Sequence, residues 1–197
     1  MEAPSDVTRS SSCAITYYLA ANPDVQRKLQ KELDEALESE DDSSTSFEAV
    51  KNLPYLNAVI NEALRLHSTS GIGLPRIVPE GGMSIQGHFF KEGTVLSVPS
   101  YTIHRDREVW GDDAAIYRPE RWFERDNDAI QRTFNPFSYG PRCVMPEAVA
   151  LLTANDTLLR RACVGRNLAV LELLIIISSI FYRYEIVLER PDEPVRR

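Results

Sequence analysis

Two short stretches of this 197-residue chain decide its fold: F-N-P-F-S-Y-G-P-R at residues 134–142 and A-C-V-G-R-N-L-A at residues 162–169. Between them lie residues 143–161, C-V-M-P-E-A-V-A-L-L-T-A-N-D-T-L-L-R-R, whose composition is unlike that of the flanking sequence. Removing these residues joins the two stretches into F-S-Y-G-P-R-A-C-V-G-R-N-L-A, a single loop that contains glycine, arginine and one cysteine. The two stretches are therefore interpreted as one loop that an insert divides.

The surroundings of Cys163 favour a deprotonated sulfur. Arg161 and Arg166 flank this cysteine, Gly165 allows close approach of the backbone, and an apolar helical run opens at Asn167. Positive charge and a helix N-terminus both stabilise a thiolate. A buried structural cysteine is the ordinary alternative, and a cysteine nucleophile is another, although no histidine is placed by the sequence to activate it. The pattern favours a thiolate ligand.

Composition narrows the classes of function. With 43% hydrophobic residues the chain can form one globular domain with its own core. A net charge of -7 argues against nucleic acid as a partner. The cysteines at positions 13, 143 and 163 and the three histidines lack the spacing of a zinc site or a disulfide framework, so we expect an intracellular, reducing compartment. No signal peptide is visible, and polar residues interrupt the apolar run 168–184, which predicts a buried helix rather than a membrane span.

Hydrophobic periodicity predicts a mainly α-helical chain with a small β element. Residues 10–21 resemble the later part of a helix, and Asn22-Pro23-Asp24 provides an N-cap, a proline at the first helical position and an early acid for the next one. That helix carries an apolar stripe at intervals of four residues: Val25, Leu29, Leu33 and Leu37. Pro54 starts a further helix, and the glycines within residues 74–98 predict small hairpins.

Several motifs, in order, resemble those of the cytochrome P450 monooxygenases. Joined across the insert, the divided loop resembles the haem-thiolate loop of that family. Glu62-Ala63-Leu64-Arg65 resembles its E-x-x-R helix, and Pro119-Glu120-Arg121-Trp122 resembles its P-E-R-F segment. The resemblance implies one partial domain over residues 1–197, the truncated C-terminal part of the P450 fold. Residues 143–161 are then foreign to the family, either as translated intron sequence, the simpler account, or as an evolved loop extension.

The resemblance also implies a haem b cofactor (iron protoporphyrin) with Cys163 as the axial ligand of its iron. Cys143 directly follows Arg142 and breaks the R-x-C spacing, so we prefer Cys163. Arg76 and Arg142 match positions that pair with the haem propionates, a task that suits guanidinium groups. Arg161 also reads R-x-C with Cys163, so either Arg142 or Arg161 could stand beside the sulfur.

Two further groups of residues take implied roles. Glu62, Arg65 and Arg121 would form a buried structural charge network. Residues 3–8, A-P-S-D-V-T, resemble the oxygen-activating A-G-x-D-T-T of the family, in which an acid and a hydroxyl relay protons. Asp6 and Thr8 would be these catalytic groups, although valine stands where the first threonine belongs. A ragged N-terminal tail is the alternative.

Residues 67–82 and 97–106 are similar to those of the fungal benzoate para-hydroxylases within the family. That similarity implies that a small aromatic acid lies against one segment: Thr69, Ser70, Gly71, Ile72, Gly73 and Leu74. The implied function is hydroxylation of a small organic substrate with dioxygen and electrons from an NADPH-dependent reductase. Family members are anchored to the endoplasmic reticulum, and no anchor is visible in this chain. The alternative is a non-catalytic truncated fragment with weak or no haem binding.

Overall fold

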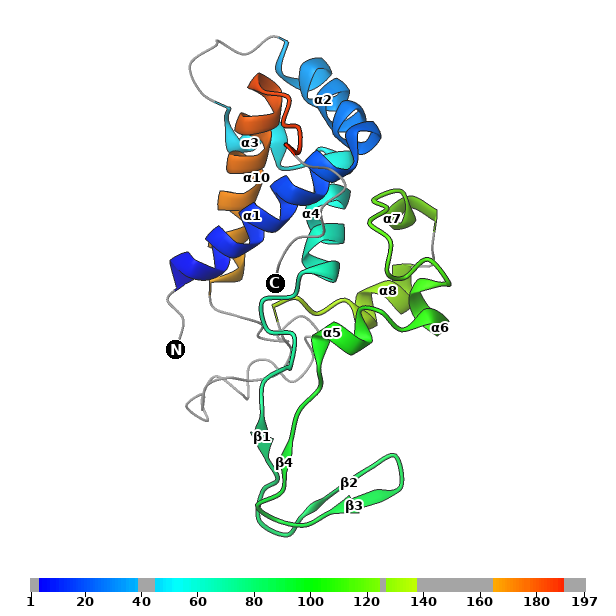
Figure 1. The fold of residues 1–197 in the computed structure, drawn as a ribbon. Coiled ribbons are helices and arrows are strands. Elements are labelled where there is room, and N and C mark those ends of the chain that lie inside the picture. The colour runs from blue at the N-terminus through cyan, green and yellow to red at the C-terminus, as the bar shows by residue number, and fades with distance from the viewer. Residues whose placement is uncertain (1–3, 39–44, 125–126, 138–164, 190–197) are drawn as a thin grey trace.

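The computed structural model describes residues 4–38, 45–124, 127–137 and 165–189. One group of packed helices contains α1 (Pro4–Ala21), α2 (Pro23–Leu37), α3 (Phe47–Val50), α4 (Pro54–Leu66) and α10 (Arg166–Arg183). In Figure 1, α1 and α10 lie against each other, and α2 and α4 flank them. These helices enclose the larger apolar core, which confirms the expected mainly helical fold.

Helix α2 begins at Pro23, as the sequence predicts, but Asn22 does not cap it with its side chain. The Asn22 side chain instead donates from Nδ2 to the carbonyl of Tyr18, 2.8 Å away, and so closes the end of α1. The predicted apolar stripe of α2 is correct, because all four of its residues are buried. Gln26 is buried beside them and exchanges two hydrogen bonds with the backbone of Ile186, which fixes the segment after α10 on α2.

Helix α4 begins at Pro54, again as predicted, and is buried on nearly every side. Its first free amides find a partner outside the helix. The carboxylate of Glu32, on α2, accepts from the backbone N–H groups of Tyr55 and Leu56, each at 2.8 Å. A negative group at a helix N-terminus is favourable both as an acceptor and through the helix dipole. This contact fixes the start of α4 against α2.

Among the described residues, the β part consists of two small antiparallel pairs, which confirms the expected hairpins. Strand β1 (Arg76–Ile77) pairs with β4 (Val95–Leu96), and β2 (Met83–Ile85) pairs with β3 (His88–Phe90). The turn between β2 and β3 has positive φ at both central residues, Gln86 (48°) and Gly87 (81°), as a tight type I′ hairpin requires. The two pairs extend away from the helices (Figure 1).

Four short helices follow: α5 (Ser100–Ile103), α6 (Arg107–Trp110), α7 (Arg121–Glu124) and α8 (Asn127–Thr133). They surround a second, smaller apolar cluster of Trp110, Ala114 and Ile130, against which Trp122 and Phe134 pack. Phe134 also packs against the larger core. The first residue of the divided loop therefore lies where the two apolar clusters meet.

Helix α10 follows the divided loop and buries one face: Leu173, Leu174, Ile177, Ser178 and Phe181. The buried hydroxyl of Ser178 donates to the carbonyl of Leu174 at 2.6 Å, so this polar group is satisfied within the helix. Within the part of the chain that the structure describes, no helix is long and apolar enough to cross a membrane.

Candidate functional site

The centre of the candidate site is a pair of charged residues on α4, Glu62 and Arg65, whose side chains are both fully buried. They are three positions apart, so both side chains leave the same face of the helix. Arg65 donates from Nε and Nη2 to the two carboxylate oxygens of Glu62, at 2.9 and 2.8 Å. This two-point contact fixes both side chains in one orientation.

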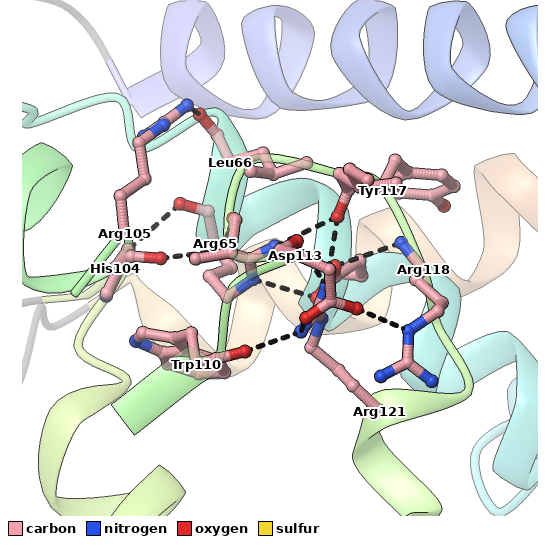
Figure 2. A network of polar contacts seen from close by, with 12 residues as sticks. Arg65, Leu66, His104, Arg105, Trp110, Asp113, Tyr117, Arg118 and Arg121 are labelled. Atoms are coloured by element: carbon pink, nitrogen blue, oxygen red, sulfur yellow. Dashed lines mark hydrogen bonds and ion pairs between the residues drawn. The ribbon is translucent and has the colours of Figure 1, made fainter. Parts of the chain in front are cut away.

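A second buried arginine, Arg121 at the start of α7, completes the network. Its Nε donates to Oε1 of Glu62 at 2.8 Å, and its Nη1 lies 3.1 Å from Oδ1 of Asp113. The two terminal nitrogens of its guanidinium also donate to backbone carbonyls, and Nη1 lies 2.9 Å from the carbonyl oxygen of Trp110. Figure 2 shows Arg121 reaching both Asp113 and the Trp110 carbonyl. The network therefore joins α4, α7 and the loop between α6 and α7.

The Glu62 carboxylate accepts two hydrogen bonds besides those from the guanidinium groups of Arg65 and Arg121. The backbone N–H of Arg118 donates to Oε1, and the indole N–H of Trp122 donates to Oε2, each at 3.1 Å. Arg65 in turn binds the carbonyls of His104 and Ala114, both at 2.6 Å. Every charge in the network thus has either an opposite charge or backbone dipoles around it, the condition under which charge is tolerated in a core.

Asp113 lies at the edge of this network. Burial raises the pKa of its carboxyl group, but hydrogen bonds from Arg118 and Arg121 outweigh that effect and hold the pKa at about 2. Asp113 is therefore ionised at neutral pH and gives Arg121 a second carboxylate besides Glu62. Arg65, by contrast, has only Glu62 as a carboxylate partner in the described part of the chain.

His104, the residue after α5, connects this network to the divided loop. Its Nδ1 lies 3.1 Å from the carbonyl of Arg65, and its Nε2 lies 2.9 Å from the backbone nitrogen of Asn135. Because Asn135 N–H can only donate, Nε2 must be the acceptor and Nδ1 must carry the proton. Burial lowers the pKa of His104 to about 4, with the charge of Arg65 acting in the same direction.

The two described ends of the divided loop lie close together. Arg166, the first residue of α10, places its guanidinium carbon 5.8 Å from the centre of the Phe137 ring. Residues 138–164 run between these points, and the predicted residues Arg142, Arg161 and Cys163, as well as Cys143, lie outside the described residues. The loop thus starts at the network, through Asn135, and ends at the N-terminus of α10.

Arg76, the expected propionate partner, is exposed on β1. Among the described residues none gives its guanidinium a hydrogen bond or an ion pair, so it is available to a carboxylate. Ile72, four residues before Arg76, and Val98, two residues after its strand partner Leu96, are also exposed, at 84% and 58%. An exposed guanidinium together with exposed apolar side chains suits a flat apolar group that carries carboxylates, such as haem.

The segment 69–74, predicted to contact substrate, is held against residues 97–101. Ser97 Oγ donates to the carbonyl of Ile72 at 2.8 Å, and the backbone N–H of Tyr101 donates to the carbonyl of Gly71 at 3.0 Å. Gly73 has a φ of +75°, and a Cβ there would lie 2.1 Å from the carbonyl oxygen of Val98. Only glycine fits this close approach, so the two stretches singled out in the sequence form one unit.

The two predicted proton-relay residues lie in the first turns of α1, which begins at Pro4. The backbone carbonyl of Thr8 accepts from Ser12 Oγ at 2.9 Å, and the Thr8 side chain is partly buried. The side chain of Asp6 lies outside what the structure describes. Nearby, Ser10 Oγ lies 3.0 Å from Nε2 of His67, a contact that ties α1 to the end of α4.

Comparison with known proteins shows the family to which the chain belongs. The family profile of cytochrome P450 matches residues 1–144. The chain belongs to the cytochrome P450 family. Benzoate 4-monooxygenase bphA of Aspergillus niger is 44% identical over 191 residues, and pisatin demethylase of Fusarium vanettenii is 34% identical over 190 residues. These alignments cover 95% and 96% of this chain but 33% of each relative, so the chain spans about a third of the length of the curated relatives it matches.

Haem is the cofactor that the P450 family implies. Within the described residues there is no cluster of three or more His, Cys, Asp or Glu side chains that could hold a metal ion. The residues that the sequence associates with haem are instead a single cysteine and dispersed arginines. Of these, Arg76 lies in the described part of the chain, and its exposed guanidinium fits the group.

Sequence reasoning missed several members of the site. Asp113, Trp122 and the backbone N–H of Arg118 all bind the charge network. His104 connects the network to the divided loop, yet it lies about forty positions after α4, and no periodic pattern in the sequence relates His104 to that helix. His104 belongs to the stretch 97–106, singled out in the sequence by resemblance, but that resemblance assigned it no partner.

Proposed function

We propose that this chain is part of a haem-thiolate monooxygenase in which Cys163 would supply the thiolate that holds the haem iron. The observation that carries the proposal is the position of the two described ends of the loop that contains Cys163. Its beginning is bound to the buried Glu62–Arg65–Arg121 network through His104, and its far end opens α10 at Arg166. Cys163 precedes Arg166, the first residue of α10, by three positions in the sequence, and a helix N-terminus and a guanidinium both favour the thiolate over the thiol.

In this proposal the arginines bind the cofactor through charge. Arg76, with Arg142 or Arg161, would hold the two propionates, since guanidinium groups pair with carboxylates in a fixed geometry. Haem held in this way would supply the redox chemistry that inserts one atom of dioxygen into a C–H bond. Asp6 and Thr8 would pass protons toward the reacting oxygen from the first turns of α1.

We propose a small aromatic acid as the substrate and an NADPH-dependent reductase as the electron donor. The 44% identity to a benzoate 4-monooxygenase supports this class of substrate. The segment 69–74 would contact the substrate, because residues 97–101 hold it in one conformation and leave Ile72 exposed. The remaining substrate contacts would come from regions that the longer relatives have and this chain does not match.

The decisive experiment is an absorption spectrum of the chain expressed with haem, reduced and exposed to carbon monoxide. We expect the Soret band of a thiolate-ligated haem in the wild type, in Cys143→Ala and in Cys13→Ala, whose cysteine is exposed on α1. Cys163→Ala should lose that band. Failure of the wild-type chain to take up haem would reject the proposal and favour a non-catalytic fragment, and a band that survives in Cys163→Ala would reject the ligand assignment.

Substrate class is tested on the same haem-loaded chain. Titration with benzoate should shift the Soret band as the substrate displaces water from the haem pocket, whereas toluene, which lacks the carboxylate, should have a much weaker effect. Ile72→Ala should weaken the benzoate response measured per molecule of bound haem. Equal responses to benzoate and toluene would contradict an aromatic acid as the substrate.

A further inference from the structure

We propose that His104 is a positioning residue that clamps the start of the cysteine loop onto the helix of the buried charge network. The proposal rests on the proposed function, because it concerns the loop that would carry the thiolate. His104 contacts neither substrate nor cofactor in this role. It acts through the loop, by holding Asn135 at a fixed distance from α4.

The clamp has two sides, both made by one fully buried imidazole. On the α4 side, His104 and Arg65 bind each other reciprocally: Nδ1 of His104 donates to the Arg65 carbonyl, and Nη1 of Arg65 donates to the His104 carbonyl. On the loop side, Nε2 accepts from the backbone N–H of Asn135 at 2.9 Å. One ring therefore transmits the position of Arg65 to Asn135.

Aromatic packing holds the ring in place. The His104 ring lies 6.3 Å from that of Trp110 in an edge-on contact and 5.5 Å from that of Phe134, the residue before Asn135. Phe134 in turn packs edge-on against Trp122 at 4.8 Å, and Trp122 donates to Glu62. The loop start is thus bound to the network twice, once through His104 and once through Trp122.

The clamp works only with a neutral histidine. Protonation would turn Nε2 from an acceptor into a donor facing the donor N–H of Asn135. The nearest cations, Arg65 on α4 and Arg105 beside His104, both oppose a further positive charge. The other charged groups on the packed elements do not compensate, because Glu62 is bound to Arg65 and Arg121, and Arg107, Glu108 and Arg132 are exposed.

Two substitutions separate the two sides of the clamp. In His104→Asn the side-chain amide can replace Nδ1 as donor to Arg65, but it is too short to reach Asn135. In His104→Gln the side-chain oxygen lies near the position of Nε2 and can accept from Asn135, while the contact with Arg65 is lost. A residue needed only to support Arg65 would favour Asn over Gln, whereas the clamp requires the opposite order at the loop.

The first measurement is amide hydrogen exchange of Asn135 in the isotope-labelled, haem-free chain. Exchange should become about tenfold faster in His104→Asn, the effect of losing one hydrogen bond, and change much less in His104→Gln. His88→Asn is the matched control, because His88 is exposed on β3. Unchanged exchange of Asn135 in His104→Asn would overturn the clamp, and this result does not depend on haem.

The second measurement is the carbon monoxide spectrum of the haem-loaded variants. His104→Asn should convert a larger fraction of the reduced haem from the thiolate-ligated form to the thiol-ligated or unligated form, and His104→Gln should restore most of the thiolate band. Faster exchange with an unchanged spectrum would show a contact without a positioning role and would overturn the proposal. If the wild type binds no haem, the proposed function fails and the positioning role is rejected with it, while the exchange data still measure the contact.

Discussion

Replacing Glu62 by glutamine tests the charge network most directly, because it removes the charge and keeps the shape. The carboxylate of Glu62 accepts five hydrogen bonds, three of them from the fully buried guanidinium groups of Arg65 and Arg121. After Glu62→Gln, Arg121 still has the carboxylate of Asp113. Arg65 keeps its backbone carbonyls and the neutral amide oxygen of the new glutamine, so one buried cation loses its counter-charge.

Leaving one buried cation uncompensated costs about 3–5 kcal/mol. Because a folded domain is stabilised by only about 5–15 kcal/mol in total, the Glu62→Gln variant should be close to unfolding without denaturant. Urea unfolding followed by tryptophan fluorescence is the suitable assay. Both tryptophans of the chain, Trp110 and Trp122, contact the network, so their emission reports on it directly.

Two companion variants make the reasoning refutable. Glu48→Gln removes an exposed carboxylate that pairs with Lys51, and such surface pairs contribute less than about 1 kcal/mol. The double variant Glu62→Gln/Arg65→Met removes both members of the buried pair and should be more stable than the sum of the two single variants predicts. If Glu62→Gln lowers the free energy of unfolding no more than Glu48→Gln does, the network does not stabilise the fold as argued.

Three further predictions use the same unfolding assay. Glu32→Ala removes the acceptor for the first amides of α4 and should cost about 1 kcal/mol, whereas Glu35→Ala, at an exposed site on α2, should cost clearly less; equal losses would contradict the cap. Gly73→Ala should destabilise the chain more than Gly87→Ala, since both have positive φ but only the Cβ at 73 would meet a backbone carbonyl, at 2.1 Å; the reverse order would refute the close approach. The pKa of His104 is about 4 in the folded chain against 6.5 for a free histidine, so between these pH values the unfolded chain binds more protons than the folded one. The free energy of unfolding should therefore fall by about 3 kcal/mol from pH 7 to pH 4. An equally steep fall in the His104→Gln variant would show that another group is responsible.

Much of the helical framework could be predicted because its signals are local. The stripe of α2 repeats every four residues, and Pro23 and Pro54 begin helices because proline is tolerated in the first turn. The hairpin positions followed from glycines that supply positive φ, as at Gly87. Asn22 is the exception. Its residue type favours capping α2, but its side chain instead donates to a carbonyl at the end of α1. The local sequence does not reveal this competing partner.

The sequence by itself determined the family, because the E-x-x-R and P-E-R motifs and the divided cysteine loop depend on residue type and spacing along the chain. Only the tertiary structure decided how these motifs are connected. Glu62 meets Trp122 across sixty positions, and His104 meets both Arg65 and Asn135 across more than thirty. Such contacts are fixed by how helices and loops pack, and periodicity carries no information about them. The cysteine loop, first recognised as two halves of one motif, is thereby anchored at its start by a histidine whose role no pattern in the sequence predicts.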